Sequence, residues 1–300
     1  MKIKIVFLLV ISCLMFINTS FSQVSVGFKT GVRDGEGKFK PEDLASLKNT
    51  TMVFILPSDA ELSDVKVYEK VFSEVWKYTP YKVITDDQIK TLEKGKSYSY
   101  LIIEGVSVSY NTYCFYELLM FNGKKEKIFA QIRVDGNYCD DKKFKGKTPE
   151  NMGAGYLKTY LNIINSYLSE ERILKLDETS IDNSTLKNLA TETLYVPEQY
   201  LHYTSNWGGK LKDIPEAEFF AKYPYPHKVA TTKEINELLL TSDKPIYFVG
   251  PSFYYKGDRI NCIYSSQSTE PVYYVTDGST PVDASVMKSI AKKIKSALEK

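Results

Sequence analysis

The chain has few side chains whose type and spacing could support catalysis. Its only imidazoles are His202 and His227, and His227 matches Tyr81 in an internal repeat described below, which indicates a packing position. Ser252 follows Gly250-Pro251, but the second glycine of a nucleophile elbow is missing. A Ser-His catalytic pair is therefore not expected, and we assign no catalytic residue.

Metal sites are also poorly supported by the sequence. Two histidines are too few for the common His-rich zinc sites, and no cysteines have CxxC spacing. Asp86-Asp87 lies in the first turn of an expected helix, where the helix dipole favours negative charge. Asp140-Asp141 lies in a lysine-rich loop and could, with Asp135, bind calcium weakly, but EF-hand spacing is absent. We predict no metal site.

Two glycine-rich stretches were considered as phosphate-binding loops. The stretch 31–37 has no buried strand before it, and 153–155 opens a helix without a preceding strand or a following Lys-Ser/Thr pair. Both are better interpreted as flexible turns, and we predict no cofactor.

One segment combines residues that suit ligand or partner binding. The interval from Pro197 to His227 is 30 residues, against 24 for the corresponding interval from Pro57 to Tyr81. The longer interval contains Tyr200, His202, Tyr203, Trp207, Gly208 and Gly209. Amphipathic rings beside a glycine-rich turn suit sugar stacking or protein contact. The alternative is that these rings fold back onto the core.

The amino terminus is typical of a secretory signal peptide. Lys2 and Lys4 precede an apolar run from Ile5 to Ile17, and small residues at Ser20 and Ser22 predict cleavage before Gln23. The apolar run is too short for a membrane-spanning helix of about 20 residues. A lipoprotein box ending at Cys13 is an alternative, although the apolar run continues past that residue. We therefore expect a protein exported to the periplasm or the cell exterior, with no transmembrane span in the mature chain.

Three cysteines remain after such cleavage: Cys114, Cys139 and Cys262. An odd number allows at most one internal bridge. If 115–121 and 128–134 form a hairpin, Cys114 and Cys139 fall at the same end of it. A Cys114–Cys139 disulfide is then one interpretation, and two separate thiols are the other.

Composition and charge set broad limits. The 300 residues include 39 Lys and Arg against 37 Asp and Glu, and removing the signal peptide removes Lys2 and Lys4 and no acidic residue. The mature chain is then neutral, at 37 against 37. Such a chain has no overall field that attracts nucleic acid, and we predict no nucleic-acid partner.

The second half of the chain repeats the first. Residues 81–85 (YKVIT) match 227–231 (HKVAT), and Val53–Pro57 matches Thr193–Pro197. Leu101-Ile102-Ile103 matches Tyr247-Phe248-Val249, and Cys114-Phe115-Tyr116 matches Cys262-Ile263-Tyr264. Thr85 with Gln88, and Thr231 with Glu234, each predict a capping box that opens a short helix after an extended segment. We interpret the pattern as a duplication.

Hydrophobic periodicity predicts the same order of elements in both copies: strand, helix, strand, short helix, three strands, helix. In the first copy these are 53–56, 65–76, 82–85, 86–94, 98–109, 114–121, 128–134 and a helix over Leu157–Leu168. The fold class is thus α/β to α+β, with two tandem mixed-sheet domains. We expect a signal peptide at 1–22, an N-terminal extension at 23–45, and domains at 46–172 and 173–300.

This order resembles the periplasmic α/β module of the TolB amino-terminal domain, of the curli-secretion protein CsgG and of lipoprotein activators of peptidoglycan synthases. The resemblance rests on the strand ending at Pro57, the aromatic first helix, the strand and capped helix at 82–94, and the strand Leu101–Gly105. It covers roughly 120 residues of each copy and is a likeness of topology. It implies contact with other proteins rather than catalysis, and it transfers no catalytic residue.

Three functions are therefore considered. The first is an exported, non-enzymatic cell-envelope protein that binds a protein or ligand through its sheet edges or the insertion bearing Tyr200, His202, Tyr203 and Trp207. The second is a surface protein that binds carbohydrate or peptide. The third is a hydrolase with a site in a cleft between the two copies.

Overall fold

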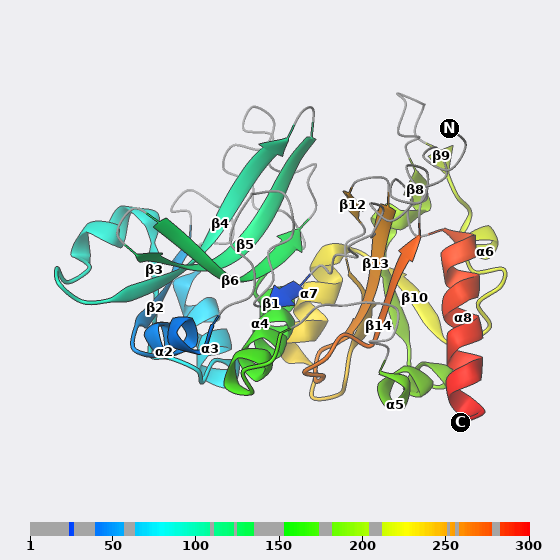
Figure 1. The fold of residues 1–300 in the computed structure, drawn as a ribbon. Helices are drawn as coiled ribbons and strands as arrows, with labels where there is room; N and C mark the ends of the chain where they lie inside the picture. Colours follow the sequence, from blue (N-terminus) through cyan, green and yellow to red (C-terminus); the bar gives the residue numbers. More distant parts are fainter. Residues whose placement is uncertain are drawn as a thin grey trace, which may run out of the picture.

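The computed structural model describes residues 24–26, 40–56, 64–108, 111–122, 125–134, 153–173, 182–203, 212–250, 253–255, 258–277 and 283–300. The expected signal peptide lies outside these residues, as do Cys13, Cys139 and Trp207. The described parts form two mixed sheets with helices packed on them (Figure 1), which confirms the predicted fold class.

The first sheet has the strand order β1-β6-β5-β4-β2-β3. β2 runs parallel to both β3 and β4, and β4, β5 and β6 form an antiparallel meander with β1 on its outer edge. The strands are β1 (Val24–Val26), β2 (Thr51–Leu56), β3 (Tyr81–Thr85), β4 (Tyr98–Val108), β5 (Asn111–Asn122) and β6 (Lys125–Val134).

The α-helices of the first half pack on one face of this sheet. α3 (Val65–Val75) begins where the Asp64 carboxylate accepts a hydrogen bond from the Lys66 amide at 3.0 Å, and its apolar residues recur at helical spacing. Its rings Tyr68 and Phe72 lie 5.3 and 5.2 Å from the ring of Phe54 in β2. The other elements of this half are α2 (Pro41–Lys48), the 3-10 helix η1 (Asp86–Thr91) and α4 (Ala154–Ser169).

The second sheet is built in the same way. β7 runs parallel to β10 and β11, while β11 and then β12 pair with one edge of β13, and β14 pairs with its other edge. The strands are β7 (Leu194–Pro197), β10 (His227–Ala230), β11 (Tyr247–Val249), β12 (Phe253–Tyr255), β13 (Asp258–Ser265) and β14 (Tyr273–Asp277). The helices are α5 (Asn183–Leu186), η4 (Lys187–Ala190), α6 (Glu216–Phe219), α7 (Thr232–Thr241) and α8 (Ala284–Leu298).

The two sheets therefore have equivalent topologies. The order β3-β2-β4-β5-β6 corresponds to β10-β7-(β11, β12)-β13-β14, with the same parallel and antiparallel neighbours. Both capping boxes are present, at Thr85/Gln88 and at Thr231/Glu234. This likeness supports duplication. We call the side of each sheet that carries its own closing helix, α4 or α8, its helix face, and the opposite side its reverse face.

Strand pairing corrects three of the sequence matches. In the first sheet Tyr81 pairs with Met52, which pairs with Ser99 on its other side. In the second sheet His227 pairs with Leu194, which pairs with Tyr247. If Tyr81 corresponds to His227, then Met52 corresponds to Leu194, and Ser99 to Tyr247. The matches of Val53–Pro57 with Thr193–Pro197 and of Leu101 with Tyr247 are therefore two residues out of register. Because side chains alternate along a strand, a slip of two keeps the same face buried and leaves the hydrophobic pattern unchanged.

The match of Cys114-Phe115-Tyr116 with Cys262-Ile263-Tyr264 is wrong by an odd number of residues. Tyr116 packs on Phe54 on the helix face of the first sheet. Tyr264 lies on the reverse face of the second sheet, with its ring 5.5 Å from Tyr160 of α4. The two tyrosines thus occupy opposite faces, and the shared cysteine does not mark an equivalent position.

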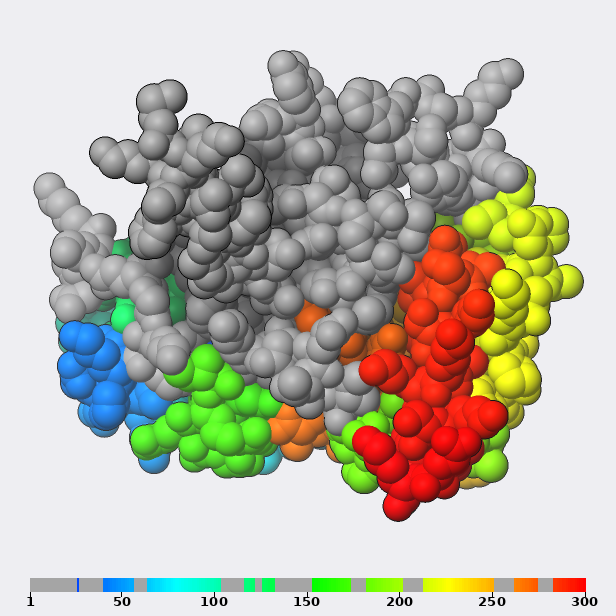
Figure 2. All heavy atoms as spheres, turned by 45° about the vertical axis from the view of Figure 1, so that its right-hand side comes forward, coloured from blue at the N-terminus to red at the C-terminus, as the bar shows by residue number. Residues whose placement is uncertain are grey.

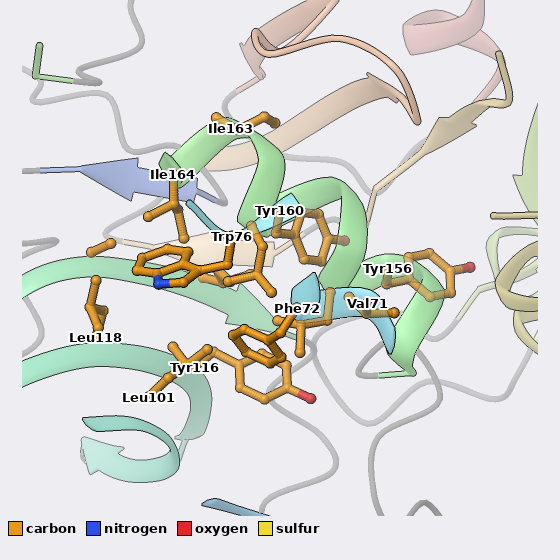
Figure 3. Close-up of a cluster of buried hydrophobic side chains, with 14 of the residues drawn as sticks. Val71, Phe72, Trp76, Leu101, Tyr116, Leu118, Tyr156, Tyr160, Ile163 and Ile164 are labelled. Carbon is orange, nitrogen blue, oxygen red and sulfur yellow. The ribbon is translucent and has the colours of Figure 1, made fainter. Parts of the chain in front are cut away.

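α4 belongs to a hydrophobic cluster that contains residues of both halves. Figure 3 shows Tyr160 and Ile164 of α4 gathered with Phe72, Trp76 and Tyr116 of the first half. The same helix packs on the second half, where Tyr156 meets Phe248 edge-on with ring centroids 5.3 Å apart. In Figure 1, α4 and α7 lie between the two sheets. One hydrophobic cluster is therefore shared across the predicted division at residue 172, and a second cluster lies wholly in the second half.

α8 is placed differently, at the surface of the second half (Figure 2, red). It begins at Asp283, whose carboxylate accepts hydrogen bonds from the amides of Ser285 and Val286 at 2.8 and 3.0 Å. Its buried side contacts a second cluster formed with β7, β11 and α6. Its outer side carries the exposed lysines Lys288, Lys292, Lys293 and Lys295.

Candidate functional site

The predicted insertion begins at the carboxyl end of β7, in the middle of three parallel strands. It starts with the 3-10 helix η5 (Glu198–Leu201) and continues into a two-stranded sheet of β8 (His202–Tyr203) and β9 (Lys212–Asp213). The crossover helix α6 lies on the helix face, whereas α7 lies on the reverse face. The ends of β7 and β11 therefore form a topological switch point, which is where open α/β sheets usually bind ligands.

Tyr200 fills the space between these strand ends. Its side chain is only 9% exposed, and its hydroxyl donates a hydrogen bond to the Gly250 carbonyl oxygen at 2.6 Å. Gly250 directly follows β11, and its own amide donates to the Cys262 carbonyl oxygen at 2.8 Å. Tyr200 thus acts as an anchor that fixes the insertion to the second sheet. Its ring is buried and does not lie on an open surface. For this residue the structure agrees with the alternative in which the rings of the insertion fold back onto the core.

A second contact ties η5 to the start of α7. The hydroxyl of Thr232, which is 1% exposed, donates to Gln199 Oε1 at 2.9 Å. The hairpin is closed by the Ile214 amide, which donates to the Leu201 carbonyl oxygen at 2.8 Å. Gln199 and Thr232 were not found from the sequence. The sequence contains one signal for this contact. The capping box uses the hydroxyl of Thr231 alone, which leaves the hydroxyl of the adjacent Thr232 to find another partner.

The amino terminus of α7 is occupied by the protein's own carboxylate. Glu234 accepts hydrogen bonds from the Thr231 amide and hydroxyl at 2.8 and 2.9 Å, and these bonds lower the pKa of Glu234. A phosphate at this helix end would have to displace that negative charge. The switch point therefore does not have the electrostatics of a phosphate site.

The other sequence-predicted site residues are only partly described. His202 and Tyr203 form β8, with their backbones opposite Asp213 and Lys212, and Trp207 lies outside the described residues. The structure thus brings Tyr200 to the base of the insertion and puts His202 and Tyr203 in the strand that leaves it.

His227 occupies a packing position, as its match with Tyr81 indicates. Its ring stacks on Phe220 with centroids 3.8 Å apart, and its Nδ1 lies 2.8 Å from the Tyr225 carbonyl oxygen. Tyr81 likewise packs on Phe72 of α3, with centroids 5.5 Å apart. Both rings thus contact the segment that crosses between the first two parallel strands of their own copy.

The contact between the copies is closely packed where the hydrolase hypothesis would require a cleft. The Gly155 amide of α4 donates to Asn236 Oδ1 of α7 at 2.9 Å. A Cβ added at Gly155 would lie 2.3 Å from the Asn236 carbonyl oxygen, so the two helices approach at backbone distance. The described residues along α4 and α7 form an apolar contact and no group of carboxylates.

One charged cluster does bridge the copies. Glu270, in the turn between β13 and β14, accepts a hydrogen bond from the Tyr167 hydroxyl and pairs with Arg172 at 2.8 Å. Arg172 also lies 4.2 Å from the centroid of the Tyr167 ring. Burial, reinforced by Glu270, raises the pKa of Tyr167. Glu270 thus holds both Tyr167 and Arg172 of the first copy, which is the arrangement of a structural clamp.

Three further findings concern the described residues. They contain no group of three or more His, Cys, Asp and Glu side chains placed to hold a metal ion. None of their helices has both the length and the apolar character needed to cross a bilayer. The predicted hairpin of β5 and β6 is confirmed, with Cys114 opposite Val134 at the end of β6, but Cys139 lies outside the described residues and the disulfide stays a prediction.

The chain has no significant match among protein-family models, curated proteins or solved structures. The resemblance to TolB, CsgG and the synthase activators therefore stays a prediction.

Proposed function

We propose that the chain is an exported, non-enzymatic cell-envelope protein that binds another envelope component through the insertion at 198–213. The observation that carries the proposal is the Tyr200–Gly250 hydrogen bond of 2.6 Å at the switch point of the second sheet. It fixes the base of an aromatic insertion to a rigid scaffold, which lowers the entropy lost when the insertion binds. Export to the periplasm or cell exterior, with cleavage before Gln23, is part of this proposal.

The edge strands of the parallel sides are less suitable as contacts. β3 and β10 each pair with one strand among the described residues, and each carries an exposed lysine, Lys82 and Lys228. Lysines on an edge strand discourage the addition of a further strand. We therefore favour the insertion over the sheet edges as the binding surface.

A double variant tests the insertion directly. Tyr203→Ala with Trp207→Ala should reduce partner recovery in quantitative pull-down from envelope extracts at least about tenfold, because aromatic side chains dominate binding energies. Leu298→Ala is the control, since Leu298 is 52% exposed and lies at the end of α8, far along the chain from the insertion. Unchanged recovery by a folded double variant would contradict the proposal.

The same rings would also suit a surface glycan, which is the alternative function. Tyrosine and tryptophan faces stack on sugars as well as on protein. Binding on a glycan array that is lost in the double variant would select the glycan. Silence on the array, combined with loss of a protein partner, would select the protein.

A further inference from the structure

The outward positions of the closing helices α4 and α8 carry different side chains. Counted from the N-caps Gly153 and Asp283, each position of α4 has an equivalent in α8. Four of these positions are exposed lysines in α8, namely Lys288, Lys292, Lys293 and Lys295. Their equivalents in α4 are, in the same order, Lys158, Asn162, Ile163 and Asn165.

In α4 every one of these positions contacts another part of the chain. Lys158 pairs with the Glu74 carboxylate of α3 at 2.5 Å. Asn162 donates a hydrogen bond to a backbone carbonyl oxygen in the β13–β14 turn at 3.2 Å, and Asn165 accepts one from the first backbone amide after the C-cap of α3 at 2.8 Å. Ile163 is completely buried. The outward side of α4 is therefore an interaction surface within this chain.

In α8 none of the four lysines has an ion-pair or hydrogen-bond partner among the described residues. All four are exposed, and the helix Ala284–Leu298 contains no aspartate or glutamate. The first acidic residue after it is the C-cap Glu299, which Lys300 follows. α8 thus carries four positive charges and no negative charge within the helix.

This segregation of charge contrasts with the rest of the chain. With the two lysines of residues 1–22 subtracted from 39, basic and acidic side chains balance at 37 each. On α3, Lys70 and Glu74 stand four residues apart with their charged atoms at 4.0 Å, a common pattern on solvated helices. Elements packed on α8 do not neutralise it: η4 adds the exposed Lys187, and in the described structure Glu216 and Glu218 of α6 form no ion pair with α8.

Three of the four lysines form one stripe along the helix. Lys288, Lys292 and Lys295 are four and three residues apart, which places them on the same side of α8. The stripe lies away from the buried side, and Figure 2 shows α8 at the surface of the molecule. A flat surface of opposite charge can therefore meet all three lysines at once.

The composition of this side favours a charged layer over a protein partner. Lysine is a compact, strongly hydrated charge on a flexible stem, and it lacks the planar fork with which arginine recognises single carboxylates and phosphates. Protein interfaces are enriched in aromatic residues and arginine and depleted in lysine, whereas α8 has no aromatic residue and no arginine. Lysine clusters on a helix attract anionic lipid headgroups mainly through their number of charges.

We propose that the lysine face of α8, formed by Lys288, Lys292, Lys293 and Lys295, binds the surface of a bilayer that contains anionic phospholipids. The apolar side of α8 stays buried against β7, β11 and α6, so the helix lies on the headgroups and does not insert. Export into the envelope, which belongs to the proposed function, brings the protein to such a surface. Membrane binding by the lysine face is a separate task from partner binding by the insertion at 198–213.

Sedimentation with unilamellar vesicles measures this binding on the purified protein as it is recovered after export. Each lysine near an anionic surface contributes about fivefold to membrane affinity, so four lysines predict a partition coefficient on the order of 10³ M⁻¹. About half of the protein should then bind at about 1 mM accessible lipid in vesicles with about 30% phosphatidylglycerol, and none to phosphatidylcholine alone. Binding should be lost at about 1 M salt, where the Debye length falls to about 3 Å.

Two variants with the same change of charge locate the binding face. Lys288→Gln/Lys292→Gln/Lys295→Gln should lower the partition coefficient about a hundredfold, because three of the four charges are gone. The control Lys82→Gln/Lys90→Gln/Lys94→Gln removes three exposed lysines of the first half and should change it by less than about threefold. Glutamine matches lysine in helix propensity and all six positions are exposed, so both variants should keep the wild-type unfolding temperature.

Acylation of lysines by a water-soluble reagent, read by mass spectrometry, locates the contact independently. Vesicles with phosphatidylglycerol should slow the acylation of positions 288, 292 and 295 and leave positions 82, 90 and 94 unchanged. Equal losses in the two triple variants, equal binding to phosphatidylcholine, or no binding to either vesicle would overturn the proposal. Displacement by millimolar glycerol phosphate would also overturn it, because that result indicates a discrete anion site.

The insertion variant separates this surface from the proposed function. Tyr203→Ala/Trp207→Ala should bind vesicles as the wild type does, and the triple variant of α8 should still recover the partner of the insertion from envelope extracts. Loss of vesicle binding in the insertion variant would contradict the assignment of the membrane contact to α8.

Discussion

The helices that close the two repeats, α4 and α8, differ in how much of their surface is buried. Eleven of the sixteen residues of α4 are buried, against six of the fifteen residues of α8. Counted from the N-caps Gly153 and Asp283, the buried Ile163 corresponds to the exposed Lys293. α4 lies between two repeats and needs an apolar surface on two sides, whereas α8 packs on one repeat and has a polar outer side.

The reverse faces of the two sheets differ as well. The second sheet has α4 and α7 on its reverse face, and the first sheet has the short η1 on the same side. The outer side of α8 therefore carries exposed lysines, while the first sheet has the exposed side chains of Ile89 and Phe121 outside its helix face.

The largest expected effect is at the contact between the repeats. Gly155→Ala should lower the free energy of unfolding by about 2–3 kcal/mol, because the new Cβ would meet the Asn236 backbone at 2.3 Å and force α4 away from α7. Ser285→Ala, at the equivalent position of α8, should change it by less than about 0.5 kcal/mol, since Ser285 is exposed. Urea unfolding of both variants measures the difference. Equal effects would contradict the distinction between a helix that packs on both repeats and one that packs on a single repeat.

A smaller effect distinguishes the two capping boxes. The lowered pKa of Glu234 means that its bonds to Thr231 stabilise the start of α7 above its ordinary pKa of 4.5 and lose this effect as the pH falls through the lowered value. Gln88, at the same position in the first box, does not titrate. Amide exchange by NMR should show the first turn of α7 opening more readily at pH 3 than at pH 6. Glu234→Gln should remove that pH dependence, and a variant that keeps it would show that another group is responsible.

The order of the helices and strands was predictable from the sequence because each element is marked by a sequence signal within a short segment. The capping boxes, the hairpin of 115–121 with 128–134 and the apolar periodicity of α3 rest on signals within short segments, and the structure has all of them. Register was less predictable, since a shift of two residues leaves the same side chains buried. The error of three residues at Tyr264, which strand pairing aligns with Leu119 and not with Tyr116, arose because a cysteine and a tyrosine recur at equal spacing on opposite faces.

The candidate site was predictable as a segment and not as a set of contacts. The extra length after Pro197 located the insertion, but the partner of Tyr200 is a backbone carbonyl oxygen fifty residues away in sequence. No side-chain pattern signals such a bond. The shared core was missed for a related reason. One stripe on α4, Leu157–Leu168, was enough to predict the helix, and its second apolar side at Tyr156, Tyr160 and Ile163 only acquires meaning once the second sheet is in place.

Amide hydrogen exchange of the full chain along a denaturant series tests the shared core most directly. If α4 unites the repeats, the slowest amides of β2, α4 and β13 should share one opening free energy and one dependence on denaturant. If β13 and α8 stay protected at concentrations where β2, α3 and α4 have already exchanged, the repeats unfold separately and the account of a cluster shared through α4 is wrong.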